Sequence, residues 1–103
     1  VADEAVVSAR GLFALVAEDR ARVVAHPRAT LAAVRLFEML PGRPIVTLPW
    51  AVEALGASKP TVGRAIEVLE GCGVLREMTG RQRGRKFGYG AYLEALAIGT
   101  GRP

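Results

Sequence analysis

The chain of 103 residues has little of the chemistry on which many active sites and small folds depend, with one cysteine, one histidine and 6% aromatic side chains. Cys72 has no partner for an intramolecular disulfide, and a single thiol in an apolar stretch is typical of a reducing compartment. His26 is distant from Cys72 in sequence and the carboxylates are scattered, so no set of metal ligands is evident. We therefore expect a cytoplasmic protein without disulfide, metal or cofactor.

Sequence motifs of catalysis and long hydrophobic runs are also absent. No GxxxxGK[ST] or GxGxxG motif opens a helix, and a reactive pairing of Cys72 with His26 is the single catalytic alternative that the residues leave open. No apolar run approaches the roughly 18 residues of a membrane span, and Asp3 and Glu4 occupy the place of a basic signal-peptide region. We expect no enzyme activity and no membrane partner. Because the chain begins with Val1, we expect a piece of a longer protein.

Positive charge is concentrated in one part of the chain. Residues 1–57 contain six basic and six acidic side chains, whereas residues 58–87 contain seven basic and three acidic ones. Residues 88–103 contain one of each, so the net charge of +4 comes from residues 58–87. A local excess of cations of this kind is typical of a surface that binds a polyanion.

Helix-forming residues dominate the first part of the chain. Apolar residues recur at helical spacing without a proline from Asp3 onward, which predicts a long helix that His26-Pro27 ends. The predicted inward face comprises Ala5, Ala9, Leu12, Phe13, Val16, Val23 and Val24. Val7 and Leu15 lie off this stripe, which leaves open a second apolar contact with another copy or another domain.

A second helix and a short strand follow. Residues 29–40 are predicted to form a helix with Leu31 and Phe37 among its inward residues. A proline-glycine turn at 41–44 and a β-branched strand at 45–47 come next.

The stretch from Leu48 to Tyr89 contains two helices in quick succession and then two strands. Gly56 is expected to end the first helix in the left-handed conformation, and Ser58 to cap the second, because its hydroxyl can accept from free N–H groups of the first turn. The residues of the second helix that should face the core are Val62, Ala65, Ile66 and Leu69. The remaining predicted elements are a glycine stop at 71–73, a strand at 74–78, a loop at 79–84, a strand at 85–89 and a closing helix at 91–98.

This order of elements predicts a mainly α fold with a small antiparallel β wing, namely a winged helix-turn-helix preceded by a long N-terminal helix. Such domains usually place the second helix of the pair in the DNA major groove. We divide the chain into a linker or packing helix at 1–27, a winged domain at 28–98 and a frayed tail at 99–103.

The second helix of this pair carries the predicted DNA contacts, together with the loop that follows it. Arg64 is the best candidate for reading a base, since a guanidinium can bond bidentately to guanine. Lys59 and Thr61 are predicted phosphate contacts, and Ser58 reads or positions with them. The glycine-flanked loop is predicted to clamp phosphates or enter the minor groove through Arg81, Arg83, Arg85 and Lys86. Glu67 would oppose this binding if it faced a phosphate.

Two runs of residues resemble one protein family. The first reads ALGASKPTVGRAI at 54–66, and the second reads GVLREMTGRQR at 73–83, followed by Tyr89 and later Tyr92. The pattern is similar to the C-terminal winged-helix domain of bacterial Fic (filamentation induced by cAMP) proteins, and the resemblance covers nearly the whole chain. Gly63 stands where a serine is common in that family.

The resemblance implies a regulatory or targeting domain rather than a catalytic one. Fic proteins transfer a nucleotide monophosphate to hydroxyl groups through a histidine in an HPFxxGN-type loop, whereas here His26-Pro27 is followed by Arg28-Ala29. It therefore implies a fragment without transferase activity, joined to a Fic transferase domain in the same polypeptide. Two functions remain as expectations. One is a domain that binds double-stranded DNA, and the other is an interaction module or homodimer that regulates the transferase without binding DNA.

Overall fold

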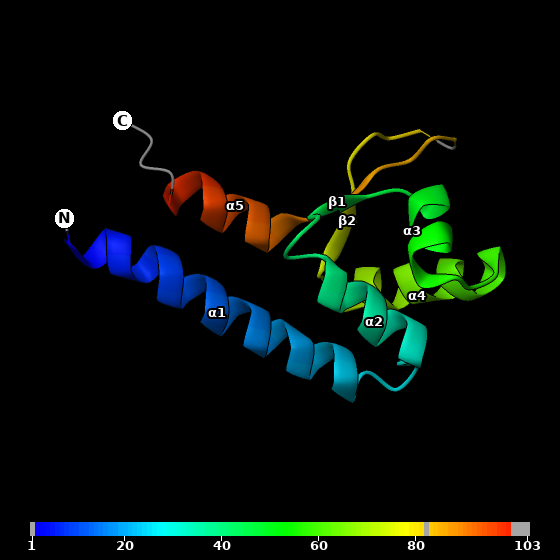
Figure 1. Cartoon of the computed structure of the whole chain (residues 1–103), viewed down its shortest axis with the longest axis horizontal. Helices are drawn as coiled ribbons and strands as arrows, with labels where there is room; N and C mark the ends of the chain where they lie inside the picture. The colour runs from blue at the N-terminus through cyan, green and yellow to red at the C-terminus, as the bar shows by residue number, and fades with distance from the viewer. Residues whose placement is uncertain (1, 82, 100–103) are drawn as a thin grey trace.

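Helices make up most of the molecule, with a small sheet beside them (Figure 1). The computed structural model describes residues 2–81 and 83–99. The helices in this part are α1 (Ala2–Ala25), α2 (Leu31–Met39), α3 (Leu48–Leu55), α4 (Lys59–Gly71) and α5 (Gly90–Gly99). The strands are β1 (Ile45–Val46), β2 (Leu75–Glu77) and β3 (Phe87–Tyr89), paired antiparallel in the order β1-β3-β2. The prediction of a mainly α fold with a small antiparallel sheet is thus confirmed.

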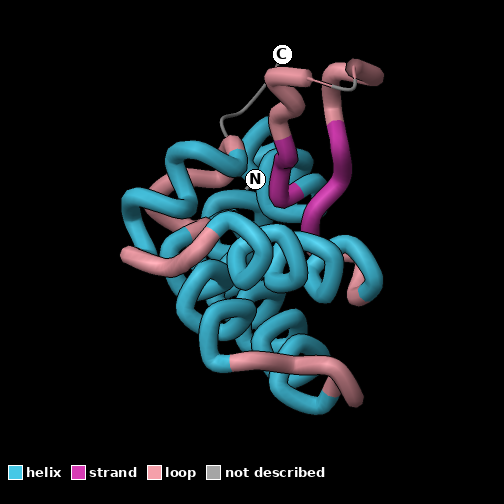
Figure 2. The backbone as a smooth tube through the Cα atoms, turned by 90° about the vertical axis from the view of Figure 1, so that its right-hand side faces the viewer, coloured by secondary structure: helices cyan, strands magenta, loops and turns pink. Residues whose placement is uncertain are grey.

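The long α1 forms one side of the molecule. α5 runs back alongside it, so that the start of α1 and the end of α5 lie at the same end (Figure 1). α2 packs against both α1 and α4. At the opposite end lie α3, α4 and the β2–β3 hairpin, and Figure 2 shows the hairpin projecting from the helices.

Tyr89 of β3 lies in the middle of the core. Its ring contacts Phe37 of α2, with ring centroids 5.7 Å apart, and stacks on Tyr92 of α5 at 5.2 Å. β3 is the central strand, and its pairing sets Phe87 opposite both Val46 and Glu77. The predicted inward residues of α4 are all buried: Val62, Ala65, Ile66 and Leu69.

One face of α1 is buried, and the predicted inward face is right for Leu12, Val16 and Val23 but wrong for Phe13 and Val24. Asp19 and Val23 are buried, whereas Phe13 and Val24 are 79% and 53% exposed. Successive helical residues are rotated by about 100°, which places Phe13 and Val24 roughly 100° away from the buried direction. Leu15, predicted to lie off the stripe, is half-buried. The side chains of the predicted positions 5, 7 and 9 lie outside the described residues.

Capping residues move several predicted boundaries. α2 begins at Leu31 because Thr30 Oγ1 accepts from the N–H of Ala33 at 3.1 Å, and Leu31 itself is 73% exposed rather than inward. β1 ends before Thr47, whose hydroxyl accepts from the N–H of Trp50 at 3.2 Å and so begins α3.

The hairpin strands and the closing helix differ from prediction by one or two residues at their ends. β2 and β3 are both shorter than predicted, although the N–H of Met78 still bonds to the carbonyl of Lys86 at 2.8 Å. Lys86 and Arg85 therefore belong to the loop end of the hairpin rather than to a strand. Of the predicted frayed tail, Gly99 is the last residue of α5, and 100–103 lie outside the described residues.

Candidate nucleic-acid interface

The turn between α3 and α4 is built as the sequence indicated. Gly56 has a left-handed φ of 63°, and its N–H bonds to the carbonyl of Val52 at 2.9 Å. Ser58 Oγ accepts from the N–H of Thr61 at 3.3 Å and so caps α4. Gly73 ends the α4 segment with a φ of 79°. These local features leave one face of α4 outside the core.

The hydroxyl groups of Ser58 and Thr61 are bonded to each other. Ser58 Oγ donates to Thr61 Oγ1 at 2.9 Å while accepting from the Thr61 N–H. The proton of Ser58 is therefore engaged, which makes this residue a capping group. Thr61 is half-buried and retains its own hydroxyl proton, which can still be donated to a ligand.

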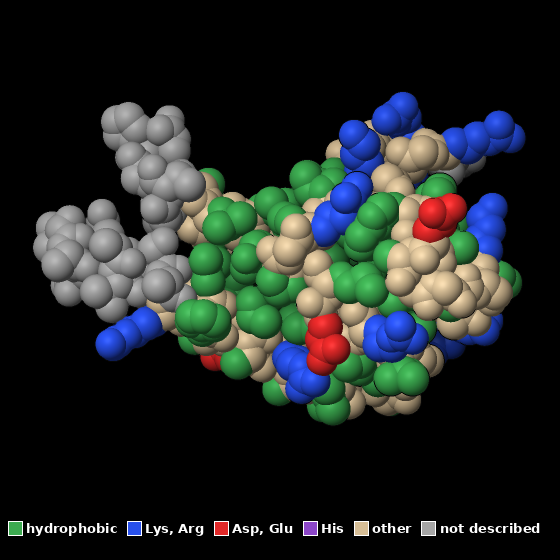
Figure 3. All heavy atoms as spheres, in the orientation of Figure 1, with side chains coloured by type: hydrophobic (Ala, Val, Ile, Leu, Met, Phe, Trp, Pro, Cys, Tyr) green, Lys and Arg blue, Asp and Glu red, His purple; other side chains and the backbone are tan. Residues whose placement is uncertain are grey.

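The hairpin carries its cations on exposed side chains. Arg81, Arg83, Arg85 and Lys86 are all exposed. Arg85 Nε donates to the carbonyl of Arg81 at 2.8 Å, which ties the two sides of the loop together. Figure 3 shows Lys and Arg side chains gathered over the hairpin, at the upper right of the view.

Glu77 fixes the start of the hairpin loop. Its carboxylate accepts from the hydroxyl of Thr79 and from the N–H groups of Thr79 and Gly80, at 2.8 Å and 2.9 Å. The hydrogen bond from the Thr79 hydroxyl is the main cause that lowers the pKa of Glu77 below its ordinary value. The carboxylate is thus charged at neutral pH and holds the loop that presents the arginines.

A groove of about 560 Å³ separates the hairpin from α4. Ile66 and Phe87 contribute apolar lining, and the charged residues along it are Lys59, Glu67, Glu70, Arg83 and Arg85. Burial raises the pKa of Glu70 above its ordinary value, and the nearby charge of Arg85 opposes this rise. The groove therefore combines three cations with two carboxylates from α4.

Arg64 does not line this groove. It borders a second cavity of about 400 Å³ between α4 and the segment that joins α1 to α2, together with His26, Arg28 and Thr30. Glu67 borders both hollows and so lies on the ridge of α4 between them. The residues predicted to act together are thus divided. Lys59, Arg83 and Arg85 meet at one groove, and Arg64 lies with residues that the sequence analysis did not include.

The cations of this surface are not neutralised by ion pairs. Within the described part of the chain, the salt bridges join Arg20 to Glu38, Arg22 to Asp19 and Arg76 to Glu94. The cations of the hairpin loop (Arg81, Arg83, Arg85 and Lys86) and those that line the two hollows form no ion pair in this part of the chain. Their charge is therefore available to an external anion.

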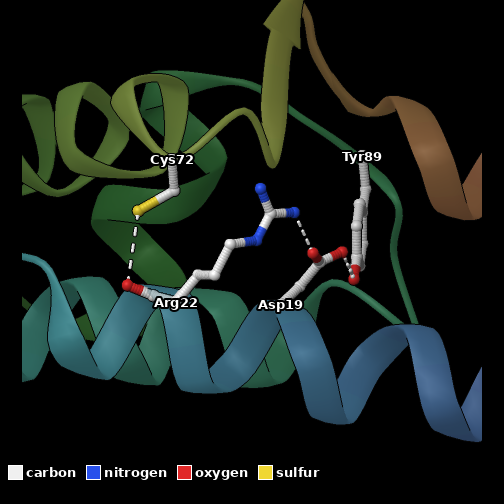
Figure 4. Close-up of polar contacts among 4 residues, drawn as sticks. All are labelled: Asp19, Arg22, Cys72 and Tyr89. Atoms are coloured by element: carbon white, nitrogen blue, oxygen red, sulfur yellow. Dashed lines mark hydrogen bonds and ion pairs between the residues drawn. The ribbon is translucent and has the colours of Figure 1, made fainter.

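A buried polar cluster joins α1 to the sheet, as Figure 4 shows. Tyr89 donates its hydroxyl to Asp19 Oδ2 at 2.7 Å, and Arg22 pairs with the other carboxylate oxygen. Burial and the bond to Asp19 raise the pKa of Tyr89, and the bond to Asp19 raises the pKa of Arg22. Sequence reasoning missed this cluster, although an acid at the middle of an apolar stripe and three residues before an arginine was its signal.

Cys72 and His26 make contacts with other groups. The thiol of Cys72 donates to the carbonyl of Arg22 at 3.8 Å, and burial raises its pKa above the ordinary value, which keeps it protonated at neutral pH. His26 Nδ1 accepts from the N–H of Arg28 at 3.0 Å. These contacts do not join the two residues as a nucleophile and its base.

No protein-family model matches this chain, and no curated protein matches it. Within residues 2–81 and 83–99, no helix has both the length and the apolar character that crossing a membrane requires. The same residues include no group of three or more His, Cys, Asp or Glu side chains placed to hold a metal ion. The geometry around α4 and the hairpin is therefore the basis for assigning a function.

Proposed function

We propose that this chain is a winged helix-turn-helix domain that binds double-stranded DNA, with α4 as the recognition helix and the β2–β3 hairpin as the wing. The observation that carries the proposal is the groove between them, where Lys59 of α4 and Arg83 and Arg85 of the hairpin converge without ion-pair partners among the described residues.

Physical dimensions support this assignment. The DNA major groove is about 12 Å wide and an α-helix with its side chains is about 10–12 Å across, so one exposed helix fills the groove. Gly63 adds no bulk to the outer face of α4, which allows close approach. The hairpin arginines lie beyond the helix, where planar guanidinium groups can bond bidentately to phosphates.

Binding to a mixed-sequence DNA duplex tests the proposal. Each neutralised phosphate contributes about −0.9 to the slope of log K against log salt, so four hairpin contacts predict a slope of about −3.6 between about 50 and 200 mM salt. Fluorescence anisotropy of the 103-residue chain measures it. The double variant Arg81→Gln/Arg83→Gln is expected to lower the slope by about 1.8.

A matched control removes two charges elsewhere. Arg10→Gln/Arg35→Gln changes exposed arginines of α1 and α2 that border neither hollow, and it should leave the slope unchanged. Absence of binding by the unaltered chain, or binding that does not respond to salt, would contradict the proposal. If both double variants weaken DNA binding equally, the binding depends on the net charge of the chain and not on the hairpin arginines.

We also propose that the domain belongs to a cytoplasmic Fic protein and regulates or targets its transferase. The support is the sequence resemblance described above, and the reading frame upstream of Val1 tests it. A nucleotide-transferase loop of the HPFxxGN type is expected there. Its absence from the parent protein would remove this part of the proposal and leave DNA binding untouched.

One observation favours interaction with a protein as a second candidate function. Phe13 on α1 and Leu31 at the start of α2 expose large apolar side chains, and Val24 is exposed on the same side of α1 as Phe13. A second copy or the transferase domain would cover such a surface. Light scattering at high protein concentration tests self-association, and a strict monomer counts against the homodimer.

A further inference from the structure

Half of the residues that line the second cavity carry hydrogen-bond donors on their side chains, namely His26, Arg28, Thr30 and Arg64. Arg28 and Arg64 are exposed guanidinium groups that form no ion pair or hydrogen bond through their side chains within the described residues. His26 and Thr30 complete the polar lining, and Glu67 on the ridge is the single carboxylate. A cavity with this composition suits an anion with several oxygens.

The local hydrogen bonds fix which protons His26 and Thr30 can offer. His26 Nδ1 accepts from the N–H of Arg28, so in the neutral ring the proton is on Nε2. Nε2 lies beside Gly71 of α4, 3.4 Å from where a Cβ on that glycine would lie. Thr30 Oγ1 accepts from Ala33 and keeps its hydroxyl proton for another acceptor. Both residues can therefore donate to an anion.

We propose that this cavity receives a backbone phosphate of duplex DNA, so that α4 is flanked by phosphate contacts on both sides. The inference rests on the proposed DNA-binding function and adds a second contact region, made of His26, Arg28, Thr30 and Arg64. Figure 1 shows the hairpin above α4 and the segment between α1 and α2 below it.

The arrangement matches the shape of the major groove. A phosphate backbone runs along each edge of the groove, so a helix that fills it has one backbone on either side. The hairpin arginines border α4 on one side, and the cavity borders it on the other. Glu67 lies on the ridge between them and would face base edges, where a carboxylate can accept from the amino group of cytosine. An acid at this position is compatible with binding, because it points between the two backbones.

This geometry gives Arg64 a different role from the one that its sequence position indicated. Arg64 shares the cavity with Arg28 from the preceding connection, at the edge of α4 rather than on its ridge. It therefore contacts a phosphate and contributes equally on every sequence. A base reader would instead lose discrimination at one position when substituted.

The single variants Arg28→Gln and Arg64→Gln test the inference, with Arg35→Gln as the matched control. Anisotropy is measured with several duplexes of different sequence over a range of salt concentrations. Each variant is expected to weaken binding to all duplexes by the same factor and to lower the salt slope by about 0.9. Between about 50 and 200 mM salt, its affinity should fall roughly threefold less than that of the unaltered chain. Arg35→Gln should behave as the unaltered chain.

A second measurement does not depend on any variant. In an NMR titration of the unaltered chain with the same duplex, the backbone amides of Arg28 and Thr30 are expected to shift. A titration with inorganic phosphate then distinguishes a general anion pocket, which shifts these amides at low millimolar phosphate, from a contact that forms with duplex DNA. Shifts of these amides with inorganic phosphate but none with the duplex overturn the inference.

The outcomes separate this inference from the proposed function. If the unaltered chain binds, the hairpin variant weakens binding, and both Arg28→Gln and Arg64→Gln match the control, then the cavity contact is overturned and DNA binding by the hairpin stands. If Arg64→Gln relaxes preference at one base pair while Arg28→Gln has no effect, Arg64 reads a base and the inference is overturned. If the unaltered chain does not bind DNA, both fail together.

Discussion

Asp19 is the single buried charged side chain among the residues whose burial is described, with 1% of its surface exposed. Burying a carboxylate costs several kcal/mol unless hydrogen bonds compensate for the lost water. Here the hydroxyl of Tyr89 and the guanidinium of Arg22 supply that compensation. The cluster links α1 to the central strand of the sheet and specifies which face of α1 turns inward.

Replacement of Asp19 should therefore destabilise the fold. Asp19→Asn keeps the shape but removes the charge that accepts from Tyr89 and pairs with Arg22, and we expect the free energy of unfolding to fall by about 1–3 kcal/mol. Urea denaturation followed by circular dichroism measures the change. Glu18→Gln, at the exposed neighbouring position, should stay within about 0.5 kcal/mol of the unaltered chain. Equal effects of the two substitutions would show that the cluster adds nothing.

Tyr89 makes stability depend on pH at the alkaline end. Its pKa is raised in the folded state above the unfolded value of about 10, so the folded chain keeps the proton where the unfolded chain releases it. The stabilisation is complete below about pH 10 and is lost as the pH rises further. We expect the free energy of unfolding to decline above that pH more steeply than in Tyr89→Phe, by up to about 1.4 kcal/mol per pH unit.

Unfolding by urea at a series of pH values between about 9 and 11 measures this difference. The control is Tyr92→Phe, since Tyr92 donates to the carbonyl of Pro41 and leaves the bond between Tyr89 and Asp19 in place. It should keep the steep decline. The same pH profile in Tyr89→Phe and in the unaltered chain would mean that other groups cause the dependence.

Among the elements, those with ends set by nearby residues could be predicted from the sequence. Gly56, Ser58 and Gly73 act through their own backbone or through the next turn, so the α3–α4 turn and the end of α4 followed from local chemistry. The buried face of α1 followed only in part, because Asp19 lies on it through a bond to Tyr89, which is 70 residues away.

The candidate site shows the same division between local and distant information. The exposed cations of the hairpin followed from a loop sequence that has no apolar residue to bury. The grouping of Arg64 with Arg28 depends on how the segment between α1 and α2 lies against α4, which is a contact between distant parts of the chain. No spacing along either helix indicates it.

Helix α4 contains a glycine that its backbone does not require. Gly63 has an ordinary φ, and a Cβ added there would meet no heavy atom within 4 Å. Glycine inside a helix costs about 0.5–1 kcal/mol relative to alanine, so Gly63→Ala should raise the free energy of unfolding by that amount. Gly56→Ala should lower it by about 1–2 kcal/mol, because alanine is strained at a φ of 63°. Thermal unfolding compares the two, and a destabilised Gly63→Ala would contradict the expectation.

At the scale of the whole molecule, α4 and the hairpin loop place cations without ion-pair partners among the described residues at one end (Figure 1). α1 and α5 run alongside each other away from that end, and Leu12 and Leu93 are among their half-buried apolar side chains. α1 nevertheless contributes Val23 and Asp19 to the shared core. The boundary at 27/28 remains a prediction, but α1 is more than a connection in the folded chain.

Removal of residues 1–27 tests how far the remainder depends on α1. A fragment of residues 28–98 loses the acceptor of Tyr89 and exposes the core surface under Val23. We therefore expect a lower urea midpoint than for the full chain and a free energy of unfolding that is smaller by several kcal/mol. Circular dichroism and urea unfolding of both proteins measure this. A fragment as stable as the full chain would show that residues 28–98 form an independent domain.

The bond between Tyr89 and Asp19 also has a consequence for the order of folding. It closes a separation of 70 residues, while the contacts of α3 with α4 and of β2 with β3 join near neighbours in the chain. Long loops cost more entropy to close, so local contacts are expected in the transition state and the bond to α1 after it. Weakening that bond would then leave the folding rate nearly unchanged and speed unfolding, which shortens the time that each folded molecule survives before it opens.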